Sequence, residues 1–278
     1  REKNQQLQQA YEDLQDTQAQ LLEAQRLEHE REVARARIEH ELRLAQRIQH
    51  SLLPKEVPVL PGWESATYYQ PAREVGGDFY DFLFLPGGRI GFVIGDVTDK
   101  GVPAALVMAT TRSVLRGVAQ QANTPGEALR QANELIVPDM PPGMFVTCLL
   151  MILDPTTGQL HYANAGHNLP YRRHPDGVEE LRARGMPLGL MPGMHYEERE
   201  GRLLPGDTLI LYSDGLVEAH SPRGEMFGDP RLQRLLWQHG VHRGTALIDC
   251  LLRELEAFTG SDWEQEDDIT LVTLQRAP

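Results

Sequence analysis

The stretch REVGGDFYDFLFLP, residues 73–86, places a glycine pair and an aspartate directly before a run of aromatic and aliphatic residues. Runs of this composition and length favour a β-strand. Pro86, Gly87 and Gly88 follow, and a second apolar run begins at residue 89, so the two runs predict a β-hairpin. Asp78 then stands at the start of the first strand of that hairpin.

The segment Gly76-Gly77-Asp78-Phe79 is most of the GGDEF signature of a cyclic-dinucleotide synthase. Such an enzyme needs a second metal-binding aspartate well upstream of the glycine pair, on a neighbouring strand. No aspartate occurs between residues 17 and 77. The cyclase interpretation therefore fails on its own chemistry, and the informative carboxylates lie downstream.

Three further acidic positions lie at the ends of apolar, strand-like runs. Asp96 closes the run in FVIGDVTDKG, Asp214 closes the run in LILYSDGLVE, and the pair Asp267-Asp268 opens the last run in EDDITLVTL. A single aspartate at a strand end can simply cap a turn. Four such positions, each costing sheet propensity and desolvation, predict carboxylates that converge on hard cations at one edge of a sheet sandwich. Oxygen ligands without a His–Cys set favour magnesium or manganese.

From residue 54 onward, short apolar segments alternate with turn residues. Strands dominate both ends of this region and helical pairs are inserted between them, which is an α+β pattern rather than an alternating βαβ pattern. The expected strands are 63–70, 79–85, 89–97, 145–153, 159–164, 208–213 and 268–274, and the expected helices are 102–122, 125–137, 229–239 and 244–259. Residues 185–194, GMPLGLMPGM, predict a loop or flap because they are rich in glycine, proline and methionine.

Residues 1–53 contain no glycine and no proline and predict one helix about 80 Å long. Apolar residues recur at heptad spacing in two phases, which favours a parallel dimeric coiled coil with a skip between the phases. The heptad positions are Leu7, Leu14 and Leu21, then Ala24, Ile38, Ala45 and Leu52, with Leu27, Ala34 and Ile48 on the adjoining seam. A single solvated helix laid on the globular part is the alternative. Prolines from residue 54 onward end the helix, so we predict a coiled-coil linker at 1–53 and a catalytic domain at 54–278.

Composition limits the classes of partner. The formal net charge of −13 argues against a surface for nucleic acid or anionic membrane, which needs clustered lysine and arginine. Cys148 and Cys250 lie in apolar runs without a CxxC motif or a histidine neighbour, so we interpret both as buried small hydrophobes. No apolar run of 18 residues and no signal peptide occurs, which predicts a cytoplasmic protein. The missing initiator methionine suggests that an upstream sensor or receiver domain is absent from this fragment.

Five segments resemble the motifs of a known family in order and in approximate spacing. They are VGGDFYD, GDVTDKGVPAALVMA, FVTCLLMILDPTTGQLHYANAGHNLP, YSDGLVEA and DDITLV. Over about residues 44–276 the chain resembles the SpoIIE/RsbU branch of the PPM, or type 2C, metal-dependent protein serine/threonine phosphatases. LAQRIQHSLLP, at the end of the predicted helix, resembles the segment through which a coiled linker delivers signals to the family's domain. The resemblance implies a PPM-type αββα β-sandwich flanked by helices.

The resemblance also implies a two-metal hydrolase that holds two Mn²⁺ or Mg²⁺ ions. Asp96 would bridge both cations with the Val97 carbonyl as a neighbouring ligand, while Asp78 would hold one ion and Asp214 and Asp267 the other. Two cations about 3.5–4 Å apart lower the pKa of a shared water and clamp the phosphate oxygens, so that hydroxide attacks phosphorus without a side-chain nucleophile.

Three further residues have supporting roles in this interpretation. Asp268 stands beside Asp267 and supports the site rather than forming it. Asp99 either holds an extra metal or caps the helix that begins near Pro103. Arg73 either holds the substrate phosphate through its guanidinium or is a surface residue.

The resemblance further implies a phosphatase acting on phosphoserine or phosphothreonine of a bacterial regulatory protein, a STAS-domain anti-anti-sigma-like factor. A second copy of the chain would pair through residues 1–53, and the coiled helix would control metal occupancy by moving the helix that follows Asp96. A catalytically degenerate dimeric scaffold is one alternative, disfavoured by the intact carboxylates. A metal-dependent small-molecule phosphodiesterase is the other, disfavoured because no base- or ribose-binding loop and no Gly-rich phosphate cradle occurs.

Overall fold

The computed structural model describes the chain except residues 1, 241, 261 and 262, and it describes the side chains of the first helix at residues 3, 17, 18 and from residue 20 onward. The chain divides into two compact units, of which the first ends at Arg47 and the second is Ile48–Pro278. Within the described residues, no helix is both long and apolar enough to cross a membrane.

The predicted first helix is present as α1 (Glu2–Leu52). Its heptad residues Leu21, Leu27 and Ile38 are exposed, with 59%, 49% and 59% of their surface accessible. Leu7 and Leu14 lie outside the residues whose side chains are described. Exposed leucine and isoleucine at heptad spacing are what a coiled-coil helix presents to its partner, so the pairing stays a prediction.

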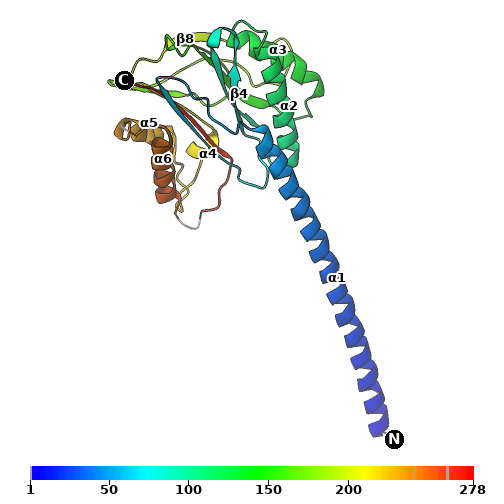
Figure 1. The fold of residues 1–278 in the computed structure, drawn as a ribbon. Coiled ribbons are helices and arrows are strands. Elements are labelled where there is room, and N and C mark those ends of the chain that lie inside the picture. Colours follow the sequence, from blue (N-terminus) through cyan, green and yellow to red (C-terminus); the bar gives the residue numbers. More distant parts are fainter. Residues whose placement is uncertain (1, 241, 261–262) are drawn as a thin grey trace. The chain divides into compact units, whose positions relative to one another are not determined.

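Two antiparallel five-stranded sheets form the centre of the second unit (Figure 1). Sheet A contains, in spatial order, β1 (Trp63–Gln70), β10 (Ile269–Arg276), β9 (Thr208–Tyr212), β6 (Tyr171–His174) and β7 (Gly177–Glu180). Sheet B contains β2 (Phe79–Phe84), β3 (Ile90–Val97), β4 (Val146–Leu153), β5 (Gln159–Ala165) and β8 (Glu198–Arg202). All seven predicted strands are confirmed to within two residues. The sequence did not predict β6, β7 and β8 because these short strands, near the sheet edges, are mostly charged or polar.

Helices cover the outer face of each sheet (Figure 1). Those on sheet B are α2 (Val102–Ala119) and α3 (Pro125–Ile136), and those on sheet A are α4 (Asp214–Val217), α5 (Asp229–Gln238) and α6 (Gly244–Thr259). Alternation along β9 separates two cores: Leu209 and Leu211 join the core between the sheets, whereas Ile210 and Tyr212 join the core under α5 and α6. The predicted αββα sandwich is therefore confirmed.

The loop predicted at residues 185–194 contains no regular element but is pinned to the core. Leu188 is fully buried and forms an isolated bridge with Val146 of β4. Asn133 of α3 donates to the Met191 carbonyl at 2.9 Å and accepts from the Gly189 N–H at 2.9 Å. This loop is therefore a fixed cover rather than a free flap.

Candidate active site

In sheet B, strand register brings Asp78 and Asp96 to the same edge. Phe79 of β2 pairs with Gly95 of β3 in antiparallel register. Asp78 directly precedes β2, and Asp96 is the next residue of β3 after Gly95, so the two carboxylates become neighbours. The hairpin predicted from the sequence thus creates half of a group of carboxylates that we call the acidic cluster. Its members are Asp78, Asp96, Asp214, Asp267 and Asp268.

Sheet A supplies the other half in the same way. Leu271 of β10 pairs with Tyr212 of β9, so the start of β10 lies beside the end of β9. Asp214 opens the short helix α4 directly after β9, and Asp267 directly precedes Asp268 and β10. The predicted convergence at the strand ends is therefore present in both sheets.

The buried side chain of Asp268 connects the sheet A strands to the loop that enters sheet B. Its carboxylate accepts the backbone N–H of Ala72 at 2.8 Å and that of Asp78 at 3.2 Å, and only 4% of its surface is exposed. Its carbonyl accepts the Ser213 hydroxyl at 3.2 Å. A β-carbon at Gly76 would collide with this carboxylate, so glycine is required there.

The second glycine gives the chain close access to the acidic cluster. A β-carbon at Gly77 would lie 2.6 Å from the Val97 carbonyl oxygen and 3.2 Å from Asp96 Oδ1. Both oxygens belong to β3 and therefore face the segment Gly76-Gly77, which we call the glycine loop. The Asp96 side chain and the Val97 carbonyl, which the family resemblance implies are neighbouring metal ligands, lie together at this point.

The carboxylates repel one another in a poorly solvated place. Burial, followed by the charges of Asp96 and Asp268, raises the pKa of Asp78 well above its usual range, although Thr270 donates a hydroxyl hydrogen bond to it. Burial and then Asp214 and Asp267 raise the pKa of Asp96 to about 8. Burial, then Asp267 and Glu218, raise the pKa of Asp214 to about 6. This all-oxygen set fits divalent cations, which would offset the repulsion.

The raised pKa values predict how the metal-free protein responds to pH. An unfolded aspartate titrates at about pH 4, whereas the folded protein raises the pKa of Asp96 to about 8 and that of Asp214 to about 6. Protonation of these groups favours the folded state, so their stabilisation is complete below about pH 4 and is lost as the pH rises through about 6 to 8. In a chelator, we expect the melting temperature to fall between about pH 7 and about pH 8.5.

Two comparisons isolate this effect. Added Mn²⁺ should flatten the pH dependence because cations replace protons at these carboxylates. Asp96→Asn should flatten it without metal, while the exposed Asp176→Asn should leave it unchanged. A melting temperature that rises over the same range in the chelator-treated protein would contradict the assigned shifts.

Lys100 contributes a positive charge that sequence reasoning missed. Its ammonium lies 2.9 Å from Asp267 Oδ2 and donates to the Glu266 carbonyl. The same charge lowers the pKa of Asp214 and so opposes part of the carboxylate repulsion. Its position in the motif GDVTDKG, four residues after Asp96, was the available signal.

A second missed residue lies at the end of α1. Gln49 is 97% buried, and its amide makes two hydrogen bonds to the backbone of Gly76: Nε2 donates to the carbonyl at 2.6 Å, and Oε1 accepts the N–H at 3.1 Å. Gly76 is two residues from Asp78. The motif RIQHSLLP was recognised, but nothing in the sequence alone pairs Gln49 with a residue 27 positions away.

The structure changes one predicted role and leaves another open. Helix α2 begins at Val102 with Gly101 as its N-cap and without a side-chain cap hydrogen bond, so the prediction that Asp99 caps this helix is wrong. Asp99 is exposed and has a left-handed backbone, with φ of 69°, which turns the chain before Gly101. Arg73 is exposed and makes no ion pair or hydrogen bond with the described part of the chain, so its phosphate role stays a prediction.

Curated relatives match most of this chain. IcfG of Synechocystis sp. (strain ATCC 27184 / PCC 6803 / Kazusa) is 33% identical over 267 residues, which cover 85% of this chain and 41% of IcfG. The phosphoserine phosphatase RsbU of Bacillus subtilis (strain 168) is 27% identical over 241 residues, which cover 86% of this chain and 71% of RsbU. The chain therefore spans less than half of IcfG and about 70% of RsbU.

Solved structures share the fold. The SiaA-PP2C domain of Pseudomonas aeruginosa aligns with a TM-score of 0.78 at 24% identity, covering 87% of this chain and 98% of that domain. The RsbU and RsbW domains of Rv1364c from Mycobacterium tuberculosis align with a TM-score of 0.69 at 32% identity, covering 81% of this chain and 63% of that one. The family model Stage II sporulation protein E (SpoIIE) matches residues 86–277. This chain belongs to the SpoIIE family and carries a PPM-type serine/threonine phosphatase domain.

Proposed function

We propose that this chain removes phosphate from phosphoserine or phosphothreonine of a bacterial regulatory protein, using two Mn²⁺ or Mg²⁺ ions. The observation that carries the proposal is the convergence of buried and half-buried, mutually repelling carboxylates at one edge of both sheets, where the pKa of Asp96 rises to about 8. RsbU, a relative matched over 86% of this chain, is named a phosphoserine phosphatase.

The proposed ligands are oxygen atoms only. Asp96 would contribute to both cations with the Val97 carbonyl as a neighbouring ligand, Asp78 would hold one ion, and Asp214 and Asp267 would hold the other. Bound cations supply a hydroxide at neutral pH and neutralise charge on the phosphate. The chain itself excludes bulk water around Asp78, fixes the glycine loop through Asp268, and places Lys100 beside Asp267.

A cysteine nucleophile does not fit this site. Cys148 lies on β4 and is fully buried, and burial raises the pKa of its thiol far above the usual range. The thiol therefore stays protonated at neutral pH and is a poor nucleophile. Attack by a metal-activated hydroxide needs no such group.

The proposed substrate is a phosphorylated STAS-domain anti-anti-sigma-like protein. Support comes from the resemblance to the SpoIIE/RsbU branch and from the similarity to the structure that holds the RsbU and RsbW domains of Rv1364c. The carboxylate cluster and its cations would bind the phosphate group rather than the surrounding polypeptide. The protein partner must therefore be selected by surfaces outside the carboxylate cluster.

One set of assays separates the proposal from its alternatives. The full chain is given a phosphoserine peptide, a small phosphate monoester and a small phosphate diester, each with Mn²⁺, Mg²⁺ or chelator. We expect hydrolysis of the peptide and the monoester with metal and none with chelator. Hydrolysis of the diester alone would favour the phosphodiesterase alternative, and no hydrolysis with any metal would favour the degenerate scaffold.

We further propose that residues 1–53 pair two copies of the chain in a parallel coiled coil. Charged substitutions at Leu21 and Ile38 would place charge in the apolar seam, so we expect the double variant Leu21→Lys/Ile38→Lys to halve the mass in light scattering. Val33→Lys is the matched control, because Val33 is 56% exposed and lies off the predicted seam. A monomeric mass for the unmodified chain would rule out the coiled coil.

A further inference from the structure

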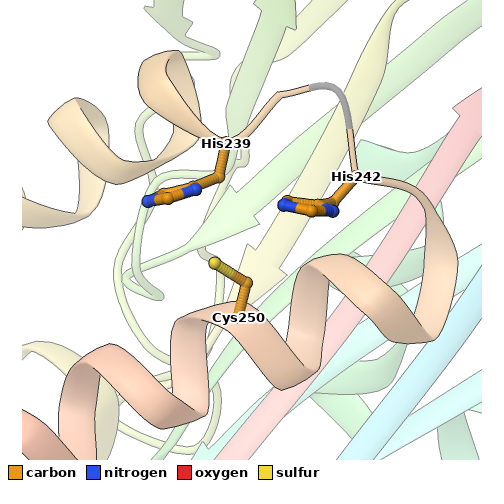
Figure 2. A group of neighbouring side chains, drawn as sticks. All are labelled: His239, His242 and Cys250. Carbon is orange, nitrogen blue, oxygen red and sulfur yellow. The ribbon is translucent and has the colours of Figure 1, made fainter.

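Three side chains that commonly bind transition metals meet in the helical layer on sheet A, and none of them belongs to the acidic cluster. His239 follows α5, His242 precedes α6, and Cys250 lies in α6 (Figure 2). The sequence interpretation treated Cys250 as a cysteine without a histidine neighbour. Its interpretation as a buried residue is confirmed, but in the folded chain both histidines lie beside the thiol.

Backbone hydrogen bonds fix the two histidines next to each other. The N–H of His239 donates to the Leu235 carbonyl at 2.8 Å and ends α5, and the N–H of His242 donates to the His239 carbonyl at 2.9 Å. The imidazole rings stack with centroids 5.9 Å apart and an interplanar angle of 24°. Figure 2 shows the Cys250 sulfur directed toward the two rings.

The distances are close to those of a bound metal. One ligand atom from each of the three residues lies within 4.8 Å of the other two. Zinc binds imidazole nitrogen at about 2.0–2.1 Å and thiolate at about 2.3 Å in tetrahedral geometry, so its ligands lie about 3.3–3.8 Å apart. The ligand atoms therefore need to approach one another by about 1 Å. The imidazoles of His239, at the end of α5, and of His242, in the loop before α6, are half-buried and can rotate by this amount.

The three groups are not committed to other partners. Within the described residues, neither imidazole makes a hydrogen bond or an ion pair with a protein group, and Cys250 is a free thiol with 5% of its surface exposed. A cavity of about 570 Å³ opens beside His242. Its lining is His242, Ala246, Asp249, Leu252, Arg253 and Glu256.

We propose that His239, His242 and Cys250 bind one Zn²⁺ ion, with the fourth coordination position open to water. Two imidazoles and a thiolate are ligands that zinc prefers, whereas Mg²⁺ and Mn²⁺ prefer carboxylate and carbonyl oxygen. The thiol releases its proton to solvent when the metal binds. The ion joins the end of α5 to the middle of α6, so it stabilises the helical layer that covers sheet A.

Cobalt substitution tests this site separately from the acidic cluster. The metal-free full chain, with excess Mg²⁺ to fill the carboxylates, is titrated with Co²⁺ under reducing conditions. We expect a thiolate-to-cobalt charge-transfer band in the near ultraviolet that saturates at one equivalent and is displaced by Zn²⁺. No band, or a band that Zn²⁺ does not displace, would overturn the proposal.

Variants identify the ligands. Cys250→Ser should abolish the band, and Cys148→Ser should keep it, because Cys148 is fully buried in β4. His242→Ala, which alters a half-buried residue, should weaken Zn²⁺ binding at least about tenfold and should remove the rise in melting temperature that Zn²⁺ causes. A band retained in Cys250→Ser, or unchanged Zn²⁺ affinity in His242→Ala, would show that the metal binds elsewhere.

Discussion

We expect Asp96→Asn to lower phosphatase activity at least about a hundredfold and, at the same time, to raise the melting temperature of the metal-free protein. Asparagine keeps the shape of the side chain but removes the charge that is proposed to bridge both cations. The folded protein raises the pKa of Asp96 to about 8, so an aspartate at this position costs the metal-free fold stability at neutral pH that a neutral side chain would not. Loss of activity with gain of stability separates a metal-binding role from a structural one.

The measurements are kcat/KM for a phosphoserine peptide at saturating Mn²⁺ and the melting temperature in chelator. Asp176→Asn, in an exposed position of the β6–β7 turn, is the matched control and should change neither value. Full activity in Asp96→Asn would overturn the two-metal assignment. Lower stability with lost activity would instead indicate that Asp96 supports the fold.

The second large effect is expected at Gln49. Gln49→Met preserves the side-chain volume but removes both hydrogen bonds to Gly76, and so leaves a buried N–H and a buried carbonyl without these partners. Each orphaned buried group costs about 1–3 kcal/mol, which the loop can reduce only by moving. Because Gly76 is two residues from Asp78, we expect the Mn²⁺ concentration for half-maximal activity to rise at least about tenfold.

If Gln49 positions the glycine loop without binding metal, its variant should differ from a metal-ligand variant in how activity depends on Mn²⁺ concentration. In Gln49→Met, excess Mn²⁺ should restore most of the turnover, whereas a ligand variant such as Asp96→Asn should not recover. Arg47→Ala, an exposed residue two positions earlier, should behave as the unmodified chain. An unchanged metal requirement in Gln49→Met would mean that the end of α1 does not influence the site.

This connection changes the regulatory hypothesis drawn from the sequence. The sequence suggested transmission through the helix that follows Asp96, because the two are adjacent along the chain. The contact between Gln49 and Gly76 provides a shorter route, from the last turn of α1 directly to the loop before Asp78. Sequence adjacency could not reveal it, since the hydrogen bonds exist only after the loop that contains Gly76 has folded against the end of α1.

The predictable parts of the fold were those that one short segment determines. Strands such as β2 and β3 are mostly apolar runs, with Asp78 directly before β2 and Asp96 near the end of β3, so both element and site could be inferred locally. The charged strand β8 has no such run and pairs only because β5 is next to it. The cap assigned to Asp99 failed because the backbone turns into the left-handed region there.

Reasoning from single segments also explains why the sequence analysis missed the contact of Lys100 with Asp267 and the group of Cys250 with two histidines. Lys100 reaches Asp267 across 167 positions of chain, and Cys250 meets His239 and His242 only because α5 and α6 are neighbours. Residue spacing along the sequence does not encode these distances. Side-chain partners of this kind follow from tertiary packing, whereas strand-end carboxylates follow from register.

The place of β10 in sheet A has a consequence for protein synthesis. This strand lies between β1 and β9, and it pairs with β1 from Ile269 onward and with β9 from Leu271 onward. A ribosome emits the hairpin with Asp78 and Asp96 long before it emits Asp267, so the nascent chain holds half of the acidic cluster and cannot close sheet A. Because Asp267 is one of the proposed metal ligands, we expect phosphatase activity only after β10 has left the ribosomal tunnel, and we expect a chain cut short before this strand to be inactive.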